Sequence, residues 1–91
     1  VAGLNVQFRS SFVRDIKGLL DKRLKDRIKA VIAQVEAAHT LQEISDLKKL
    51  KGSRDYYRIR IGDYRIALVC EEGNVTFVRC LHRREIYRYL P

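Results

Sequence analysis

The amino-acid sequence predicts an α+β fold in which two helices cover one face of an antiparallel sheet. Apolar residues alternate with polar ones at the start of the chain, follow helical spacing over residues 10–35, and alternate again over residues 56–81. A period of two is typical of strands and a period near 3.6 of helices. We therefore expect one strand, two helices, three strands and a short C-terminal helix or tail, forming a single domain of residues 1–91.

The N-terminal part is expected to combine a strand with a two-helix hairpin. Leu4, Val6 and Phe8 alternate with polar residues, which predicts a strand with one buried face. Ser10 or Ser11 is the expected cap of the first helix. The apolar stripes of the two helices comprise Phe12, Ile16, Leu19 and Leu20, and then Leu24, Ile28, Val31, Ile32 and Val35. The stretch 37–55 shows a less regular pattern.

A β-hairpin is predicted around a tight turn at Gly62-Asp63. This turn would pair Ile61 with Tyr64, Arg60 with Arg65, Ile59 with Ile66 and Arg58 with Ala67. Directly opposed residues share a face of the sheet, so Arg58, Arg60 and Arg65 should stand together on the side away from the core. Two opposed arginines repel each other unless an anion lies between them, and the forked guanidinium matches phosphate oxygens. The pattern therefore indicates a phosphate site.

The register of the next strand, Val75 to Leu81, is less constrained. A two-residue turn at Gly73-Asn74 would direct Arg79 toward the helices and His82 toward the arginines. A three-residue turn, Glu72 to Asn74, would direct Val78 and Cys80 inward and place Arg79 and Arg83 beside Arg65. We prefer the second register because burying Arg79 without a partner would be costly. His82 could still reach the arginines through a bulge at the end of the strand.

Composition restricts the class of partner. The chain has 19 Lys and Arg against 11 Asp and Glu, a net charge of +8 and a pI near 9.9, which favours a polyanionic or acidic protein partner over no partner at all. An ordinary solubilising surface is the competing interpretation. No signal peptide or long apolar run is visible, so a cytoplasmic protein without a membrane contact is expected. Cys70 and Cys80 lie in apolar runs without zinc-ligand spacing and are interpreted as core thiols.

The residue types near the predicted phosphate site could support RNA cleavage without a metal. That reaction needs a base for the 2′-hydroxyl, cations for the charged phosphate and an acid for the leaving oxygen. Arg58, Arg60, Arg65 and Arg83 are candidate cations, whereas Tyr87 and His82 are candidate proton carriers. A lone histidine near a strand end is more often structural than catalytic. Motifs of nucleotide hydrolases, metalloproteases and serine hydrolases are absent from the sequence.

Three segments resemble the RelE branch of the RelE/ParE toxin superfamily. They are Leu50-Lys51-Gly52, then Tyr57-Arg58-Ile59-Arg60-Ile61-Gly62-Asp63-Tyr64-Arg65-Ile66, and then His82-Arg83-Arg84-Glu85-Ile86-Tyr87-Arg88. The resemblance spans essentially the whole chain. It implies a ribosome-dependent endoribonuclease that cuts mRNA in the ribosomal A site, uses no cofactor or small-molecule substrate, and is silenced by a cognate antitoxin protein.

The same resemblance implies roles for individual residues. Arg65 and Arg83 would stabilise the scissile phosphate, and Tyr87 would transfer a proton or orient the nucleophile. The expected RNA-binding set is Arg58, Arg60, Lys51, Arg84 and Arg79. Some relatives carry lysines where this chain has Arg58 and Arg60, and since arginine stays charged, the base must be Tyr87 or His82. Two alternatives are a ParE-like poison of DNA gyrase and a non-catalytic RNA-binding module of the same fold.

Overall fold

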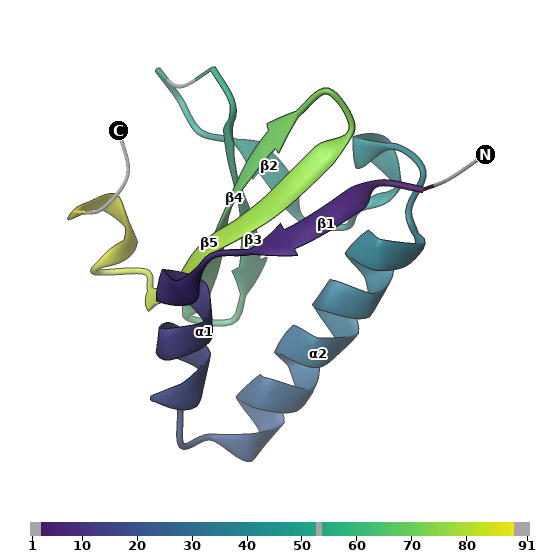
Figure 1. The fold of residues 1–91 in the computed structure, drawn as a ribbon. Helices are drawn as coiled ribbons and strands as arrows, with labels where there is room; N and C mark the ends of the chain where they lie inside the picture. The colour runs from purple at the N-terminus through teal and green to yellow at the C-terminus, as the bar shows by residue number, and fades with distance from the viewer. Residues whose placement is uncertain (1–2, 53, 89–91) are drawn as a thin grey trace.

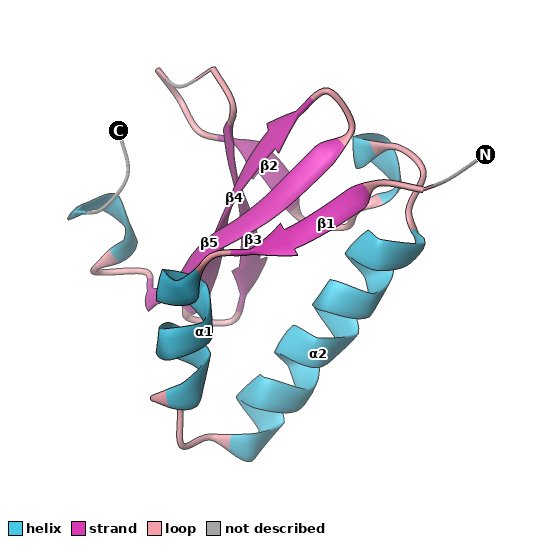
Figure 2. Cartoon of the chain, viewed as in Figure 1, coloured by secondary structure: helices cyan, strands magenta, loops and turns pink. Residues whose placement is uncertain are grey.

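The computed structural model describes residues 3–52 and 54–88, with the side chain of Tyr87 outside the described part. Its elements are β1 (Asn5–Phe8), α1 (Ser10–Lys17), α2 (Lys22–Ala37), the 3-10 turn η1 (Leu41–Glu43), β2 (Leu47–Lys49), β3 (Tyr56–Ile61), β4 (Tyr64–Glu71), β5 (Asn74–His82) and the 3-10 turn η2 (Ile86–Arg88). Both helices pack against one side of the sheet (Figures 1 and 2). The predicted α+β fold is confirmed.

The five strands form one sheet in the order β1-β5-β4-β3-β2. β1 runs parallel to β5, and the β5, β4, β3 and β2 neighbours are antiparallel. β2 was not expected: it has three residues within the stretch that showed a less regular pattern, too few for its alternation to stand out. Its pairing places Lys48 opposite Arg58, which adds a cation to the face away from the helices.

The main core lies between the helices and the sheet. Phe12, Leu24, Ile28 and Val35 are its buried residues from α1 and α2, and they meet inward-facing side chains of β3, β4 and β5. Phe77 from β5 stacks on Phe8 with ring centroids 5.2 Å apart and contacts Phe12 at the same distance. This aromatic contact joins β1, α1 and β5 at one point.

A second, smaller apolar cluster covers part of the opposite face. It consists of Ala67, Val78 and the fully buried Ile86, with Val69 and Leu81 packed against it. Ile86 belongs to η2, so the described part of the predicted C-terminal helix or tail contains a 3-10 turn, which Ile86 fixes to the sheet. The cluster keeps η2 on the face away from α1 and α2.

The helix starts differ in part from expectation. α1 follows Arg9 as N-cap, and neither Ser10 nor Ser11 provides a side-chain cap, so that expectation was wrong. The Ser11 hydroxyl instead donates to the Val78 carbonyl at 2.6 Å. α2 is capped by Asp21, whose carboxylate accepts from two backbone N–H groups of the first turn.

The β3–β4 register is the predicted one, including Arg60 opposite Arg65. The β4–β5 turn is not. Its two central residues are Glu72 and Gly73, with φ of +48° and +81°, so the turn is neither of the two that were considered. A bulge between Ala67 and Leu68 then shifts the register by one residue.

The bulge decides which β5 residues face the core. Beyond it, Cys80 lies opposite Ile66 and faces the helices, as predicted, because the bulge restores the register that a three-residue turn would give. Val78 is the extra residue of the bulge and lies in the second cluster, so its predicted inward position was wrong.

Arg79 lies opposite Ala67, on the same face of the sheet as Arg65 as expected, and its side chain forms an ion pair with Asp15 of α1. Its Nε and Nη2 donate to the two carboxylate oxygens at 2.8 and 3.1 Å, and the side chains are only 22% and 12% exposed. One of these oxygens also accepts the Cys80 backbone N–H at 2.9 Å. The cost of burying Arg79 is thus met by a partner 64 residues away, which sequence reasoning did not consider.

We predict that Asp15→Ala lowers the free energy of unfolding by about 2–3 kcal/mol, since it leaves a half-buried guanidinium and a strand N–H without their acceptor. A urea titration monitored by circular dichroism measures this change in the free energy of unfolding. Asp63→Ala is the matched control: its pair with Arg83 is 3.9 Å long and 55–70% exposed, so a change within about 0.5 kcal/mol is expected. Equal losses in the two variants would contradict the role of Asp15.

Candidate active site

A cluster of cations lies on the sheet face opposite the helices. We call it the arginine face and define it as Lys48, Arg58, Arg60 and Arg65. The β2–β3 and β3–β4 registers place these residues on one side of the sheet, with Arg60 directly opposite Arg65. Lys48 and Arg60 are exposed, and Arg58 and Arg65 are half-buried. The face therefore concentrates positive charge that solvent can reach.

The Gly62-Asp63 turn contacts the two arginines for which the family resemblance implies a role at the scissile phosphate. Nη1 of Arg65 donates to the carbonyls of Gly62 and Tyr64 at 2.9 and 3.0 Å. The backbone N–H of Arg83 donates to the Asp63 carbonyl at 2.7 Å, and its Nε lies 3.9 Å from the Asp63 carboxylate. Arg65 in β4 and Arg83 directly after β5 thus converge on one turn.

His82 does not join the arginine face. It pairs with Tyr64 in the β4–β5 register, on the side of Ile66 and Cys80, and the rings of His82 and Tyr64 meet edge to face with centroids 5.6 Å apart. Its Nδ1 accepts the Arg84 backbone N–H at 3.2 Å. The expected bulge at the strand end is absent because the bulge lies further back, between Ala67 and Leu68.

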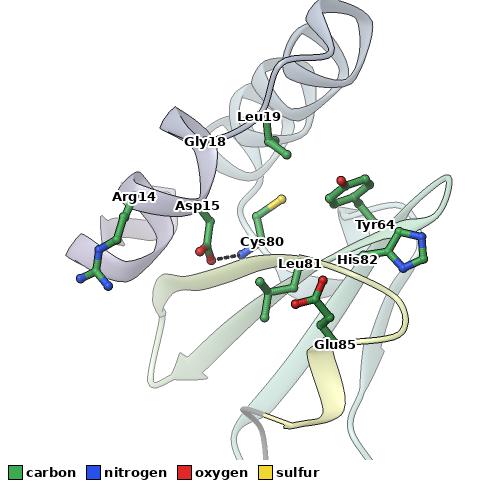
Figure 3. Close-up of a pocket in the computed structure, with 9 residues that line it drawn as sticks. All are labelled: Arg14, Asp15, Gly18, Leu19, Tyr64, Cys80, Leu81, His82 and Glu85. Carbon is green, nitrogen blue, oxygen red and sulfur yellow. Dashed lines mark hydrogen bonds between the residues drawn. The ribbon is translucent and has the colours of Figure 1, made fainter.

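A pocket of about 280 Å³ opens on this other side, between α1 and the end of β5 (Figure 3). It is lined by Arg14, Asp15, Gly18, Leu19, Tyr64, Cys80, Leu81, His82 and Glu85. Sequence reasoning missed it because the lining comes from three separate segments. The alternation of β4 and β5 could have indicated only that Tyr64 and His82 share a face.

The other candidate residues lie at different places. Lys51 is exposed in the loop after β2, and Arg84 is exposed just after β5. Arg79 lies opposite Ala67, on the same face of the sheet as Arg65, but its guanidinium is engaged by Asp15, so its role in RNA binding stays a prediction. The backbone of Tyr87 belongs to η2, but its side chain lies outside the described residues.

Comparison with known proteins places the chain in a family. Residues 6–87 match the model of the ParE toxin of type II toxin–antitoxin systems. The chain is 38% identical to toxin RelE3 of Methanocaldococcus jannaschii over 89 residues, covering 97% of this chain and all of that protein. The chain belongs to the ParE toxin family. Within this superfamily it falls in the RelE-type branch.

Solved structures of RelE-type toxins share the fold. The RelB–RelE antitoxin–toxin complex from Methanococcus jannaschii superposes with a TM-score of 0.80 at 38% identity, covering 93% of this chain and 99% of that one. The RelE–RelB complex from Pyrococcus horikoshii gives a TM-score of 0.70 at 24% identity, covering 88% and 94%. The second likeness supports the fold alone.

The described part of this RelE-type chain contains no cluster of three or more His, Cys, Asp or Glu side chains that could hold a metal ion. No helix among the described residues is both long and apolar enough to cross a membrane. The two cysteines are unpaired thiols, with Cys80 buried and Cys70 half-buried. Burial, with a smaller contribution from Asp55, raises the pKa of Cys70 to about 11. Burial, with Asp15 second, raises the pKa of Cys80 to about 12, so neither is a ready thiolate.

These pKa values predict a loss of stability in alkaline solution. The folded pKa of Cys80 lies above the ordinary value of 9.0, so its contribution is complete below pH 9 and is lost as the pH rises toward 12. Urea unfolding of this RelE-type chain at pH 8 and pH 10.5 should show a lower free energy of unfolding at the higher pH. Cys80→Val removes this titration and should reduce the difference. An unchanged difference in the variant would assign the alkaline loss to other groups.

Proposed function

We propose that this protein is a type II toxin that binds the ribosome and cleaves messenger RNA in the A site, and that a cognate antitoxin protein silences it. The observation that carries the proposal is the pair of directly opposed arginines, Arg60 and Arg65, on an exposed sheet face next to the turn that also binds Arg83. Membership of the RelE-type branch and the net charge of +8 support it.

The opposed arginines favour a bound anion. Like charges directly opposite each other on a sheet destabilise it by a few tenths of a kcal/mol or more, and a phosphate between them turns this repulsion into attraction. A cleaved phosphate gains negative charge in the transition state, so cations held in place before reaction stabilise that state more than the ground state. Backbone carbonyls already orient Arg65, which limits the reorganisation needed.

The proton-transfer role is assigned to Tyr87 in preference to His82. His82 faces the pocket on the helix side, and its Nδ1 is occupied by a backbone N–H. Tyr87 belongs to η2, the turn that the buried Ile86 fixes to the opposite face, the side of Arg60 and Arg65. A phenol ordinarily titrates near pH 10, and cations close to a phenol favour its ionised form.

An antitoxin and the ribosome are the proposed partners. The RelE-type relatives from Methanococcus jannaschii and Pyrococcus horikoshii were solved in complex with RelB, which supports an antitoxin for this chain. A segment that covers the arginine face would have to be acidic, and would compete with RNA for the same cations. Ribosomal RNA is the polyanion that the excess of basic residues fits.

We predict that Arg65→Ala and Arg83→Ala each lower the rate of mRNA cleavage on purified ribosomes by roughly 10²-fold or more, because each removes a cation from the transition state. Arg23→Ala, a change of an exposed arginine on α2, is the matched control and should retain the parent rate within a few-fold. Circular dichroism verifies the fold of all three. Folded Arg65 and Arg83 variants that cut message at the parent rate would remove both residues from the site.

We predict that Tyr87→Phe lowers the single-turnover cleavage step by roughly 10²-fold or more and leaves ribosome affinity near the parent value, since only the hydroxyl is lost. His82→Gln should have a smaller effect. A gyrase supercoiling assay run in parallel tests the competing function: inhibition of gyrase without any cleavage of message would replace the nuclease by a gyrase poison. If the Tyr87→Phe protein is active and the His82→Gln protein is inactive, the proton-transfer role belongs to His82 and not to Tyr87.

A further inference from the structure

We propose that the pocket between α1 and the end of β5 binds a nucleobase of the message strand next to the cleaved phosphate, and that it prefers bases with an exocyclic amino group over uracil. This inference rests on the proposed function, because it assumes an RNA strand on the arginine face. The pocket itself is independent of that assumption. Its volume of about 280 Å³ lies near the lower limit of small-ligand sites, roughly 300 Å³ upward.

The first argument is the hydrogen-bonding edge of β5. The Cys80 N–H points away from β4, toward Asp15, so the Cys80 carbonyl and, two residues on, the His82 N–H point the same way. β1 pairs with β5 only as far as Phe77, so no strand covers this part of the edge. Among the hydrogen bonds of the described residues, none satisfies these two groups, and both border the pocket.

A nucleobase fits this edge better than a peptide strand does. A carbonyl and an N–H two residues apart present one acceptor and one donor side by side, which is the complement of a donor and acceptor on the rim of a base. A peptide strand would need a longer run of free edge. Here Asp15 occupies the edge before Cys80, and after His82 the chain turns, with the Glu85 N–H donating to the His82 carbonyl.

The side chains of the pocket suit the flat face and the rim of a base. Half-buried Tyr64 and His82 provide aromatic surfaces and half-buried Leu19 an apolar one (Figure 3). Stacking on aromatic side chains is the usual way in which proteins hold unpaired RNA bases. The exposed Glu85 carboxylate can only accept hydrogen bonds. Adenine, cytosine and guanine offer it an amino group, whereas uracil offers only its N3–H, which is flanked by two carbonyl oxygens that the carboxylate repels.

Residues that are adjacent in the sequence connect the pocket to the arginine face. Tyr64 directly precedes Arg65, and His82 directly precedes Arg83. Neighbouring residues of a strand point to opposite faces of the sheet. An RNA strand whose phosphate binds Arg65 and Arg83 at the Gly62-Asp63 turn therefore passes the end of the sheet, where the next base can enter the pocket.

The test uses the full-length protein, labelled with ¹⁵N, and non-cleavable 2′-O-methyl RNA hexamers that differ in one base. The expected result is a saturable shift of the His82 backbone amide resonance, with the amino-bearing bases bound about tenfold or more tightly than uracil. Glu85→Gln should reduce this preference. Glu36→Gln removes the charge of an exposed glutamate on α2. It is the matched control and should keep the base preference.

Several outcomes separate this inference from the proposed function. Equal affinity for all four bases, or RNA shifts confined to the arginine face, would overturn the base pocket and leave the nuclease intact. A base-dependent His82 shift in a protein that does not cleave message on ribosomes would overturn the nuclease and keep the pocket. Absence of RNA binding would reject both. If an acidic peptide and no RNA shifts His82, the pocket is a protein-binding site and the inference is wrong.

Discussion

The Asp15 carboxylate binds the edge of β5 where no neighbouring strand does, and the geometry of the candidate active site depends on this contact. β1 pairs with β5 only through Phe77, after which the chain turns into α1. The edge of β5 would then be open where it carries the residues of the site. Asp15 accepts the Cys80 N–H and binds Arg79, and Ser11 donates to Val78. A helix thereby fixes the part of β5 that leads to His82 and Arg83.

The arginine face follows from a different constraint, the register of the β3–β4 hairpin. Because side chains alternate along a strand, burying Ile59 and Ile66 in the main core commits Arg60 and Arg65 to the other side. The hydrophobic core therefore holds two like charges opposite each other. This electrostatic cost is set by folding, and under the proposed function the binding of a phosphate would recover it before any catalytic group acts.

The sequence was sufficient for contacts between near neighbours and insufficient for distant ones. The hairpin register could be predicted because alternation and the Gly62-Asp63 turn both act locally. The ion pair of Arg79 with Asp15 joins residues 64 positions apart, and nothing in either segment indicates the other. The predicted register of β5 was wrong in detail. The turn before β5 is one residue shorter than the preferred three-residue turn, and the bulge at Val78 compensates for this difference from Arg79 onward. The pocket beside His82 depends on both the ion pair of Asp15 and the bulge in β5, so alternation along the sequence could not predict it.

The end of the sheet divides its residues between two tasks. Adjacent positions point in opposite directions, so the pairs Tyr64-Arg65 and His82-Arg83 each supply one ring to the pocket side and one cation that reaches the Gly62-Asp63 turn. A cation recognises any phosphate and carries no sequence information, whereas a pocket with fixed donors and acceptors distinguishes bases. Affinity and selectivity can therefore change independently here, because a substitution at one position leaves the neighbouring side chain on the opposite face.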